Sequence, residues 1–280
     1  MNNVANVTNS LDQFYEPMTS LEGVLARLER DGVDLTRLRA ADLAERDLDC
    51  QNLGGHRMVA WIADHVREVA APTASDRVLD VGCGIGGPGR FLVERFGCSV
   101  TGVDLLPTRI EVAEELTRRT GLTGRLVYEV VDVRSMPFED GAFGQAWMLD
   151  AGIHVRDKAA MFTELARVLR QGGLLVMHDQ IGPLGATMRP VTRHAPYIAP
   201  RLPQLIRHIE AAGLRLVRWI DTTAAIAAYF TAVKATTPAD RPRSQDAQRR
   251  QRWMERVISS YLATLTGPEG RTGLVVAVRR

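Results

Sequence analysis

The chain has 280 residues, a formal net charge of +2, and 45% hydrophobic and 24% charged residues. A chain of this length can bury a large core, so we expect one elaborated domain rather than two equal ones. The net charge is small and the basic residues are dispersed along the chain, which does not favour a nucleic-acid partner.

The cysteines and the apolar runs exclude further classes of protein. Cys50, Cys83 and Cys98 form no C-x-x-C pair, so the sequence predicts neither a zinc site nor a disulfide framework. No apolar run approaches the roughly 18 residues of a membrane-spanning helix, and no basic-then-apolar signal opens the chain. We therefore expect a cytoplasmic protein without a membrane partner.

The N-terminal part reads as helical. Residues 1–12 are polar, and we expect them to be mobile. Ser20 is a typical N-cap for a helix over 21–29, and Asp34 favours a second helix that ends near residue 45. A third helix is predicted over 57–69, where apolar residues recur at helical spacing on one face.

A glycine-rich turn follows the first predicted strand, 77–81. Gly82, Gly84 and Gly86 have no Cβ, so the backbone can adopt positive φ and pass close to a ligand. The helix that begins after the turn offers unpaired N–H groups to an anionic group. Together with Gly87, the first two glycines also satisfy G-x-G-x-x-G, which is a weak signal for a dinucleotide when it stands alone.

Carboxylates follow four successive apolar runs. The later runs that read as strands, separated by helical patterns, are 98–103, 126–131, 143–149, 174–178, 214–220 and 273–278. This alternation predicts a parallel α/β sheet. Asp80, Asp104, Asp132 and Asp150 fall at the ends of the first four strands, where the ligands of open parallel sheets bind. Four in a row is the strongest indication of a ligand site in the chain.

Two of these acids bear on the kind of ligand. Asp80 lies two residues before the first glycine, where it would repel a pyrophosphate and attract a cationic amino-acid group. Asp104 can accept hydrogen bonds from both hydroxyls of a ribose, with Leu105 and Leu106 beside the base. NAD enzymes share this second feature, so Asp104 supports a ribose ligand without choosing between cofactors.

The motif Asp80-Val-Gly-Cys-Gly-Ile-Gly-Gly-Pro88 resembles motif I of the class I S-adenosylmethionine-dependent methyltransferases. Gly-Gly-Pro followed by Arg90 resembles the sterol, tocopherol and phosphoethanolamine branch. The segments 136–143 and 167–173 resemble two connections of the same family. The resemblance implies a Rossmann-like, doubly wound sheet of seven strands with an antiparallel last strand, and S-adenosylmethionine as the cofactor, with S-adenosylhomocysteine as its product.

Within this family, the resemblance places further residues at the cofactor. Gln51, before the helix at 57–69, would line the methionine end. Asp132 would accept from the adenine amino group, with Val133 against the ring and Leu149 nearby. We divide the chain into four parts. These are an N-terminal helical cap (1–70), a cofactor-binding core (71–220), a helical insertion (221–270) and the final strand of the core (271–280).

Methyl transfer requires in-line approach, exclusion of water and removal of any acceptor proton, and it needs no metal. His154 is our first candidate base, because Asp150-Ala-Gly-Ile-His154 resembles a segment of the phosphoethanolamine and dimethylglycine methyltransferases; His178 and Tyr197 are further candidates. Asp150, His154 and Tyr197, the last in a proline-rich segment, are expected at the acceptor. In the resembling families an N-terminal Tyr closes over the ligands, and Tyr15 either does this or packs its segment down.

The acceptor is predicted to be a small metabolite, and our first candidate is a prenyl or terpenoid alkene that is C-methylated through a carbocation. Tyr15, Trp147 and Tyr197 would stabilise that cation by their aromatic faces. An O- or N-methyltransferase, a cofactor-bound cyclase and a nicotinamide oxidoreductase are alternatives. The insertion at 221–270 could cover the substrate or form a contact between subunits of a homo-oligomer.

Overall fold

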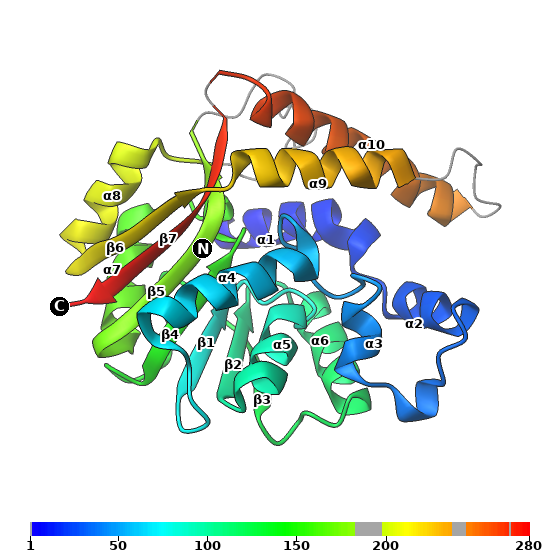
Figure 1. Cartoon of the computed structure of the whole chain (residues 1–280), viewed down its shortest axis with the longest axis horizontal. Coiled ribbons are helices and arrows are strands. Elements are labelled where there is room, and N and C mark those ends of the chain that lie inside the picture. The colour runs from blue at the N-terminus through cyan, green and yellow to red at the C-terminus, as the bar shows by residue number, and fades with distance from the viewer. Residues whose placement is uncertain (1, 183–197, 237–244, 269) are drawn as a thin grey trace.

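A single seven-stranded sheet, of order β3-β2-β1-β4-β5-β7-β6, forms the centre of the computed structural model (Figure 1). The structure describes residues 2–182, 198–236, 245–268 and 270–280. The strands are β1 Arg77–Val81, β2 Ser99–Asp104, β3 Leu126–Val130, β4 Phe143–Leu149, β5 Leu169–Ile181, β6 Leu214–Asp221 and β7 Arg271–Arg279. Strands β1 to β5 pair in parallel, whereas β7 is antiparallel to both β5 and β6. The predicted fold class is confirmed.

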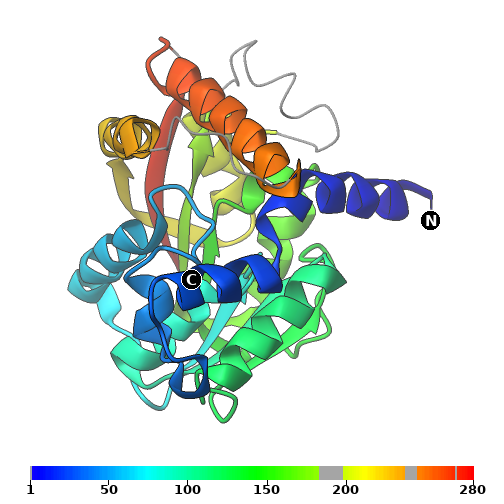
Figure 2. The ribbon, with the colours of Figure 1, turned by 90° about the vertical axis from the view of Figure 1, so that its right-hand side faces the viewer.

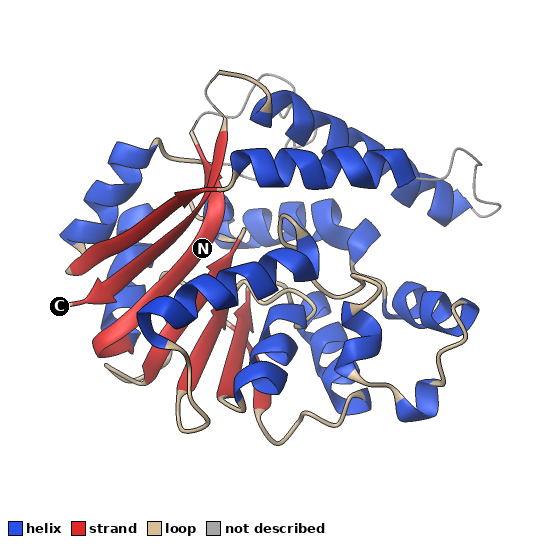
Figure 3. Cartoon of the chain, in the orientation of Figure 1, coloured by secondary structure: helices blue, strands red, loops and turns tan. Residues whose placement is uncertain are grey.

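Helices cover both faces of the sheet (Figure 3). They are α1 Asn2–Tyr15, α2 Leu21–Arg30, α3 Ala40–Ala44, α4 Gly55–Ala70, α5 Gly87–Phe96, α6 Pro107–Arg119, α7 Lys158–Val168, α8 Leu202–Ala211, α9 Thr223–Thr236 and α10 Gln245–Leu265. Successive residues of a strand point to opposite faces. Val78 therefore packs in the cluster with α4 and α5, and Leu79 in the cluster with α7 and α8.

Trp147 belongs to the first of these clusters, which corrects its predicted role. The side chain is fully buried on β4, and its indole N–H donates to Gln145 Oε1 at 2.9 Å. It does not line the cavity described below. The alternation along β4 turns Trp147 into the core, so it cannot stabilise a cation on a bound substrate.

Three local predictions also differ from the structure. Residues 2–12, for which no helix was predicted, belong to α1, where Leu11 and Phe14 bury their side chains against Leu106. The helix predicted over 34–45 is divided into a 3-10 turn and the short α3. The strand predicted over 174–178 is longer in the structure, where β5 begins at Leu169 and includes Gly172 with φ of 72°. Local patterns favoured the predicted states, and tertiary packing overrode them.

The insertion between β6 and β7 forms α9 and α10, which pack against each other above the carboxyl ends of the parallel strands (Figure 1). Helix α1 lies beside α10, where Phe14 meets Trp253, and Figure 2 shows it extending outward toward the N-terminus. The chain therefore encloses the carboxyl edge of the sheet from above. Within the described ranges, no helix has the length and apolarity needed to cross a membrane.

Candidate active site

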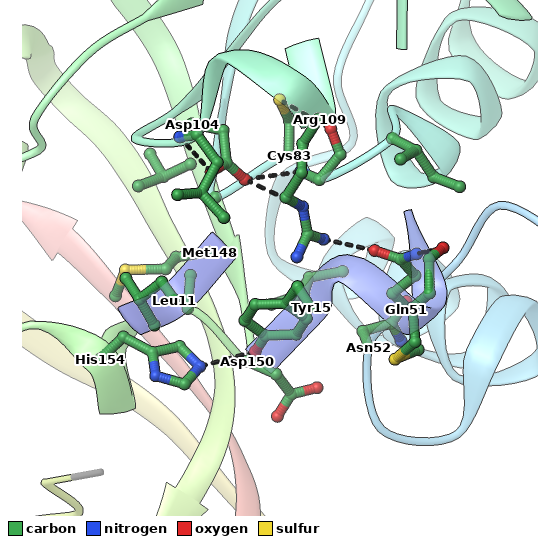
Figure 4. A pocket seen from close by; sticks show the side chains of 18 of the residues that line it. Leu11, Tyr15, Gln51, Asn52, Cys83, Asp104, Arg109, Met148, Asp150 and His154 are labelled. Carbon is green, nitrogen blue, oxygen red and sulfur yellow. Dashed lines mark hydrogen bonds and ion pairs between the residues drawn. The ribbon is translucent and has the colours of Figure 1, made fainter. Parts of the chain in front are cut away.

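A cavity of about 340 Å³ lies between the carboxyl ends of the parallel strands and the helices α1, α9 and α10. This volume is in the range of small-molecule sites. Most of the residues that the sequence places at the site line this one cavity: Tyr15, Gln51, Asp80, Gly82, Gly84, Asp104, Leu105, Asp132, Val133, Leu149, Asp150 and His154. Figure 4 shows several of them converging from separate elements.

The glycine-rich turn after β1 forms one wall of the cavity. Gly82 and Gly84 have φ values of 68° and 57°, which side chains rarely adopt. A Cβ on Gly82 would lie 2.3 Å from Ala151 Cβ, and one on Gly84 would lie 2.3 Å from Arg109 Nη2. Both positions require glycine, because the turn is left-handed and its neighbours approach the backbone directly.

Asp104, at the end of β2, is held in place by the same turn. Its Oδ2 accepts from the Gly84 N–H at 3.0 Å, and its Oδ1 accepts from the Leu106 N–H at 3.0 Å. Arg109 Nε lies 3.7 Å from Oδ2. The carboxylate is thus oriented by backbone donors before any ligand binds, while it remains part of the cavity lining.

Asp80 lies deeper than Asp104. Its side chain is 1% exposed, the Gly89 N–H donates to its carboxyl group, and Oδ2 has no hydrogen-bond partner in the part of the chain that the structure describes. Burial, with a contribution from the charge of Asp104, raises the pKa of Asp80 to about 7. Asp80 is therefore an under-satisfied carboxyl group at the base of the glycine-rich turn.

Asp132 follows β3 and forms an ion pair with Arg134 at 2.6 Å. The hydrogen bonds from Arg134 hold the pKa of Asp132 below its usual value. Val133, between these two residues, is half-buried beside the core and also lines the cavity. A charged acceptor and an apolar surface consequently face the cavity from one short segment.

Tyr15 and His154 meet across the cavity, although 139 positions separate them along the chain. The Tyr15 hydroxyl and His154 Nε2 are 2.6 Å apart. Burial raises the pKa of Tyr15 above its usual value, so the phenol is protonated at neutral pH. The pair joins the end of α1 to the short 3-10 helix after β4 (Figure 4).

Asp150, at the end of β4, has a strained backbone with φ of 58°. Its Oδ2 accepts from the Leu53 N–H at 2.5 Å, while Oδ1 has no hydrogen-bond partner among the described residues. The positive φ directs the carboxylate toward the segment before α4. Asp150 thus lines the cavity with one of its carboxylate oxygens buried and without a partner among the described residues.

The other two candidate bases, His178 and Tyr197, are not found in the cavity lining. His178 is fully buried on β5 and is absent from the cavity lining; its Nε2 pairs with Thr222 Oγ1 at 2.9 Å. Its Nδ1 lies 3.7 Å from Asp150 Oδ2, so His178 contacts a residue of the cavity lining without lining the cavity itself. Tyr197 lies outside the described residues.

Sequence reasoning missed a buried ion pair that holds the segment before α4. Arg90 Nη2 lies 2.8 Å from Asp49 Oδ2, and both side chains are 1% exposed. His56 Nε2 lies 2.7 Å from the other carboxylate oxygen. Asp49, Cys50 and His56 have the spacing of metal ligands, but Arg90 and His56 already occupy Asp49. The arginine that follows Gly-Gly-Pro in the motif, Arg90, was the sequence feature from which this ion pair could have been predicted.

Aromatic and apolar residues of α9 and α10 complete the cavity. Phe230, Trp253, Val257 and Tyr261 line it. Phe230 and Tyr261 stack with ring centroids 5.1 Å apart, and Trp253 meets Phe14 of α1 at 5.3 Å. The sequence left open whether this insertion covers the substrate or contacts another subunit, and these side chains face the cavity.

Comparisons with known proteins agree with this geometry. Residues 78–173 match the family model described as "Methyltransferase domain". The 2-methyl-6-phytyl-1,4-hydroquinone methyltransferase of Synechocystis sp. is 33% identical over 62% of this chain and 51% of its own length. This chain spans about half the length of that relative and less of other curated relatives: its match covers 29% of the length of the Arabidopsis thaliana tocopherol O-methyltransferase.

Two solved structures share the fold. Phosphoethanolamine N-methyltransferase 2 of Haemonchus contortus superposes with a TM-score of 0.74 at 20% identity, covering 86% of this chain and 57% of that one. Geranyl diphosphate C-methyltransferase of Streptomyces coelicolor gives 0.68 at 19% identity, covering 81% and 79%. The predicted resemblance to class I S-adenosylmethionine-dependent methyltransferases is confirmed, and the part of the chain that carries it most directly is residues 78–173.

Proposed function

We propose that this protein transfers a methyl group from S-adenosylmethionine to a small-molecule acceptor. The observation that carries the proposal is Asp104, held by backbone donors beside the glycine-rich turn in a cavity that Asp132 also lines. The residues fit the cofactor, because a ribose needs an oriented carboxylate and an adenine needs an acceptor with an apolar face. The unpartnered oxygen of Asp80 also favours a ligand with a cationic group.

The cofactor supplies a methyl group that its sulfonium already activates. The residues of the chain must then align the acceptor, exclude water and take up a proton. Helices α1, α9 and α10 enclose the cavity, which suits the exclusion of water. This placement of the insertion supports its interpretation as a cover over a small substrate.

We assign proton removal to His154, with Tyr15 as its positioning partner. The protonated phenol of Tyr15 can donate to Nε2 and fix the orientation of the imidazole. A proton from the acceptor can then reach Nε2 through the Tyr15 oxygen, which gives its own proton to Nε2 as it takes up that of the acceptor. Asp150, with a free carboxylate oxygen, would bind a polar or cationic part of the acceptor.

The acceptor that the lining suits best is a prenyl or terpenoid alkene. Its π electrons would form the new carbon–carbon bond to the methyl group as the sulfur–carbon bond breaks, leaving a carbocation on the acceptor. The aromatic faces of Tyr15, Phe230 and Trp253 line the cavity and can stabilise that cation, after which a proton leaves to His154. The alternative functions for the same cavity are methyl transfer to oxygen or nitrogen, and a cyclisation that uses the bound cofactor without methyl transfer.

The test is transfer of a labelled methyl group to candidate acceptors, with product identification and quantification of S-adenosylhomocysteine. We expect a labelled small-molecule product, and His154→Ala should lower turnover roughly 100-fold, as for loss of a general base, while retaining cofactor binding. Cyclised product without S-adenosylhomocysteine would identify a cyclase instead. Label in protein or RNA alone would contradict the small-molecule proposal.

A further inference from the structure

A buried arginine that the function above does not use lies inside the same cavity. Arg109 comes from the first turn of α6, is 6% exposed, and lines the cavity. Its Nη2 would be 2.3 Å from a Cβ on Gly84, so the guanidinium lies directly against the glycine-rich turn. In Figure 4 it lies among Asp104, Tyr15 and Gln51.

Contacts with Gln51 and Tyr15 fix this guanidinium. Nη2 donates to Gln51 Oε1, and the Gln51 amide N–H in turn donates to Met18 O at 2.7 Å. The Tyr15 ring lies 4.4 Å from Arg109 Cζ, which is a cation–π geometry. The side chain is therefore oriented before a ligand arrives, which limits the entropy lost on binding.

The hydrogen-bonding capacity of Arg109 is nevertheless incomplete. Its Nε has no hydrogen-bond partner within the described ranges, and the nearest carboxylate oxygen, Asp104 Oδ2, is 3.7 Å away. The ion pair with Asp104 is too long for a hydrogen bond, and a buried donor that stays without one is costly unless a ligand completes it. The two other arginines that line the cavity differ: Arg134 has a carboxylate partner at 2.6 Å, and Arg156 is exposed.

We propose that Arg109 binds the α-carboxylate of the methionine portion of the cofactor. This inference rests on the proposed function. Guanidinium and carboxylate form short, charge-assisted hydrogen bonds, and a carboxylate is the one anionic group that S-adenosylmethionine carries. Arg109 lies beside Gly84 and Gln51, where the methionine end is expected, so the site supplies the opposite charge at the required end of the ligand.

The test combines a protein change with a ligand change. Calorimetric titrations would measure the affinities of wild type and Arg109→Gln for S-adenosylhomocysteine and for decarboxylated S-adenosylhomocysteine, which lacks only the carboxylate. We expect wild type to prefer the carboxylate form roughly 10- to 100-fold, and the preference to fall to about 1- to 3-fold in Arg109→Gln. Arg109→Lys should restore part of the preference, because it keeps the charge but loses the planar fork.

Arg156→Gln is the matched control, because it removes an exposed arginine from the same lining and should keep the wild-type preference. Loss of the preference in this control, or equal weakening of both ligands in Arg109→Gln, would overturn the assignment. Tighter binding in Arg109→Gln would also overturn it, since Arg109 would then obstruct the site. If wild type binds neither ligand, the proposed function itself fails, so the two failures are distinguishable.

Discussion

Asp80 couples the stability of the ligand-free protein to pH. The folded state raises the pKa of its carboxyl group from 3.8 to about 7, mainly by burial. A raised acid pKa contributes stability that is fully present below the unfolded pKa and is lost as the pH rises through the folded value. We therefore expect the ligand-free protein to lose stability between about pH 4 and pH 7, by at most about 4 kcal/mol from this group.

Urea unfolding of wild type and Asp80→Asn at several pH values in this window checks the prediction. The amide keeps the size of the carboxyl group but does not titrate, so the free energy of unfolding of the variant should depend less on pH. Parallel pH profiles for the two proteins would show that Asp80 does not cause the loss of stability. Saturating S-adenosylhomocysteine provides a second comparison, because a bound ammonium group would favour the charged acid.

Single residues show where sequence reasoning succeeds and where it stops. Asp104 was predictable, because a carboxylate directly after a buried strand must lie at the ligand edge of a parallel sheet. Arg109 was not, because a charged residue in the first turn of a helix ordinarily faces solvent. In the folded turn, the guanidinium of Arg109 occupies the space that a Cβ on Gly84 would fill, so the side chain is buried.

At the scale of elements, the Asp49–Arg90 pair ties α5 to the segment that carries Gln51. Arg90 also donates to Ile85 O at 2.6 Å and to Thr117 Oγ1 at 3.0 Å, so one side chain connects the glycine-rich turn with α6. Its removal would leave the Asp49 carboxylate buried with His56 alone. The motif arginine thus links the segment before α4 to α5, α6 and the glycine-rich turn.

We expect Arg90→Met to lower the free energy of unfolding by about 3–5 kcal/mol, the usual cost of breaking a buried ion pair. Arg95→Met is a control on the same helix, because its ion pair with Asp64 is about half exposed and such pairs contribute about 0–1 kcal/mol. Chemical denaturation of both variants gives the comparison. Equal small losses would mean that the buried pair contributes little to stability.

The elements themselves were predicted unevenly, for physical reasons. β4 is apolar throughout and was predicted with its bounds, 143–149. α1 was missed because its sequence is polar; among its side chains that the structure describes, Leu11 and Phe14 are the buried ones, and they pack against Leu106. That contact depends on the assembled carboxyl edge, which local patterns do not contain.

For the molecule as a whole, one sheet and one cavity account for the arrangement of distant segments. Tyr15 near the N-terminus, His154 after β4 and Trp253 of α10 meet around the carboxyl edge of the sheet. The alternation of strands and helices predicted the sheet. The covering by α1 and α10 could not be predicted, because it depends on which aromatic faces meet: Phe14 against Trp253 joins the two helices.

The measurement that tests the account most directly is calorimetric titration of S-adenosylhomocysteine into wild type and Asp104→Asn. The account predicts one binding site in wild type, and affinity roughly 10- to 100-fold weaker in the variant, because an amide cannot accept two charge-assisted hydrogen bonds from the ribose. No binding to wild type would contradict the proposed function. Unchanged affinity in Asp104→Asn would contradict the placement of the ribose at the end of β2.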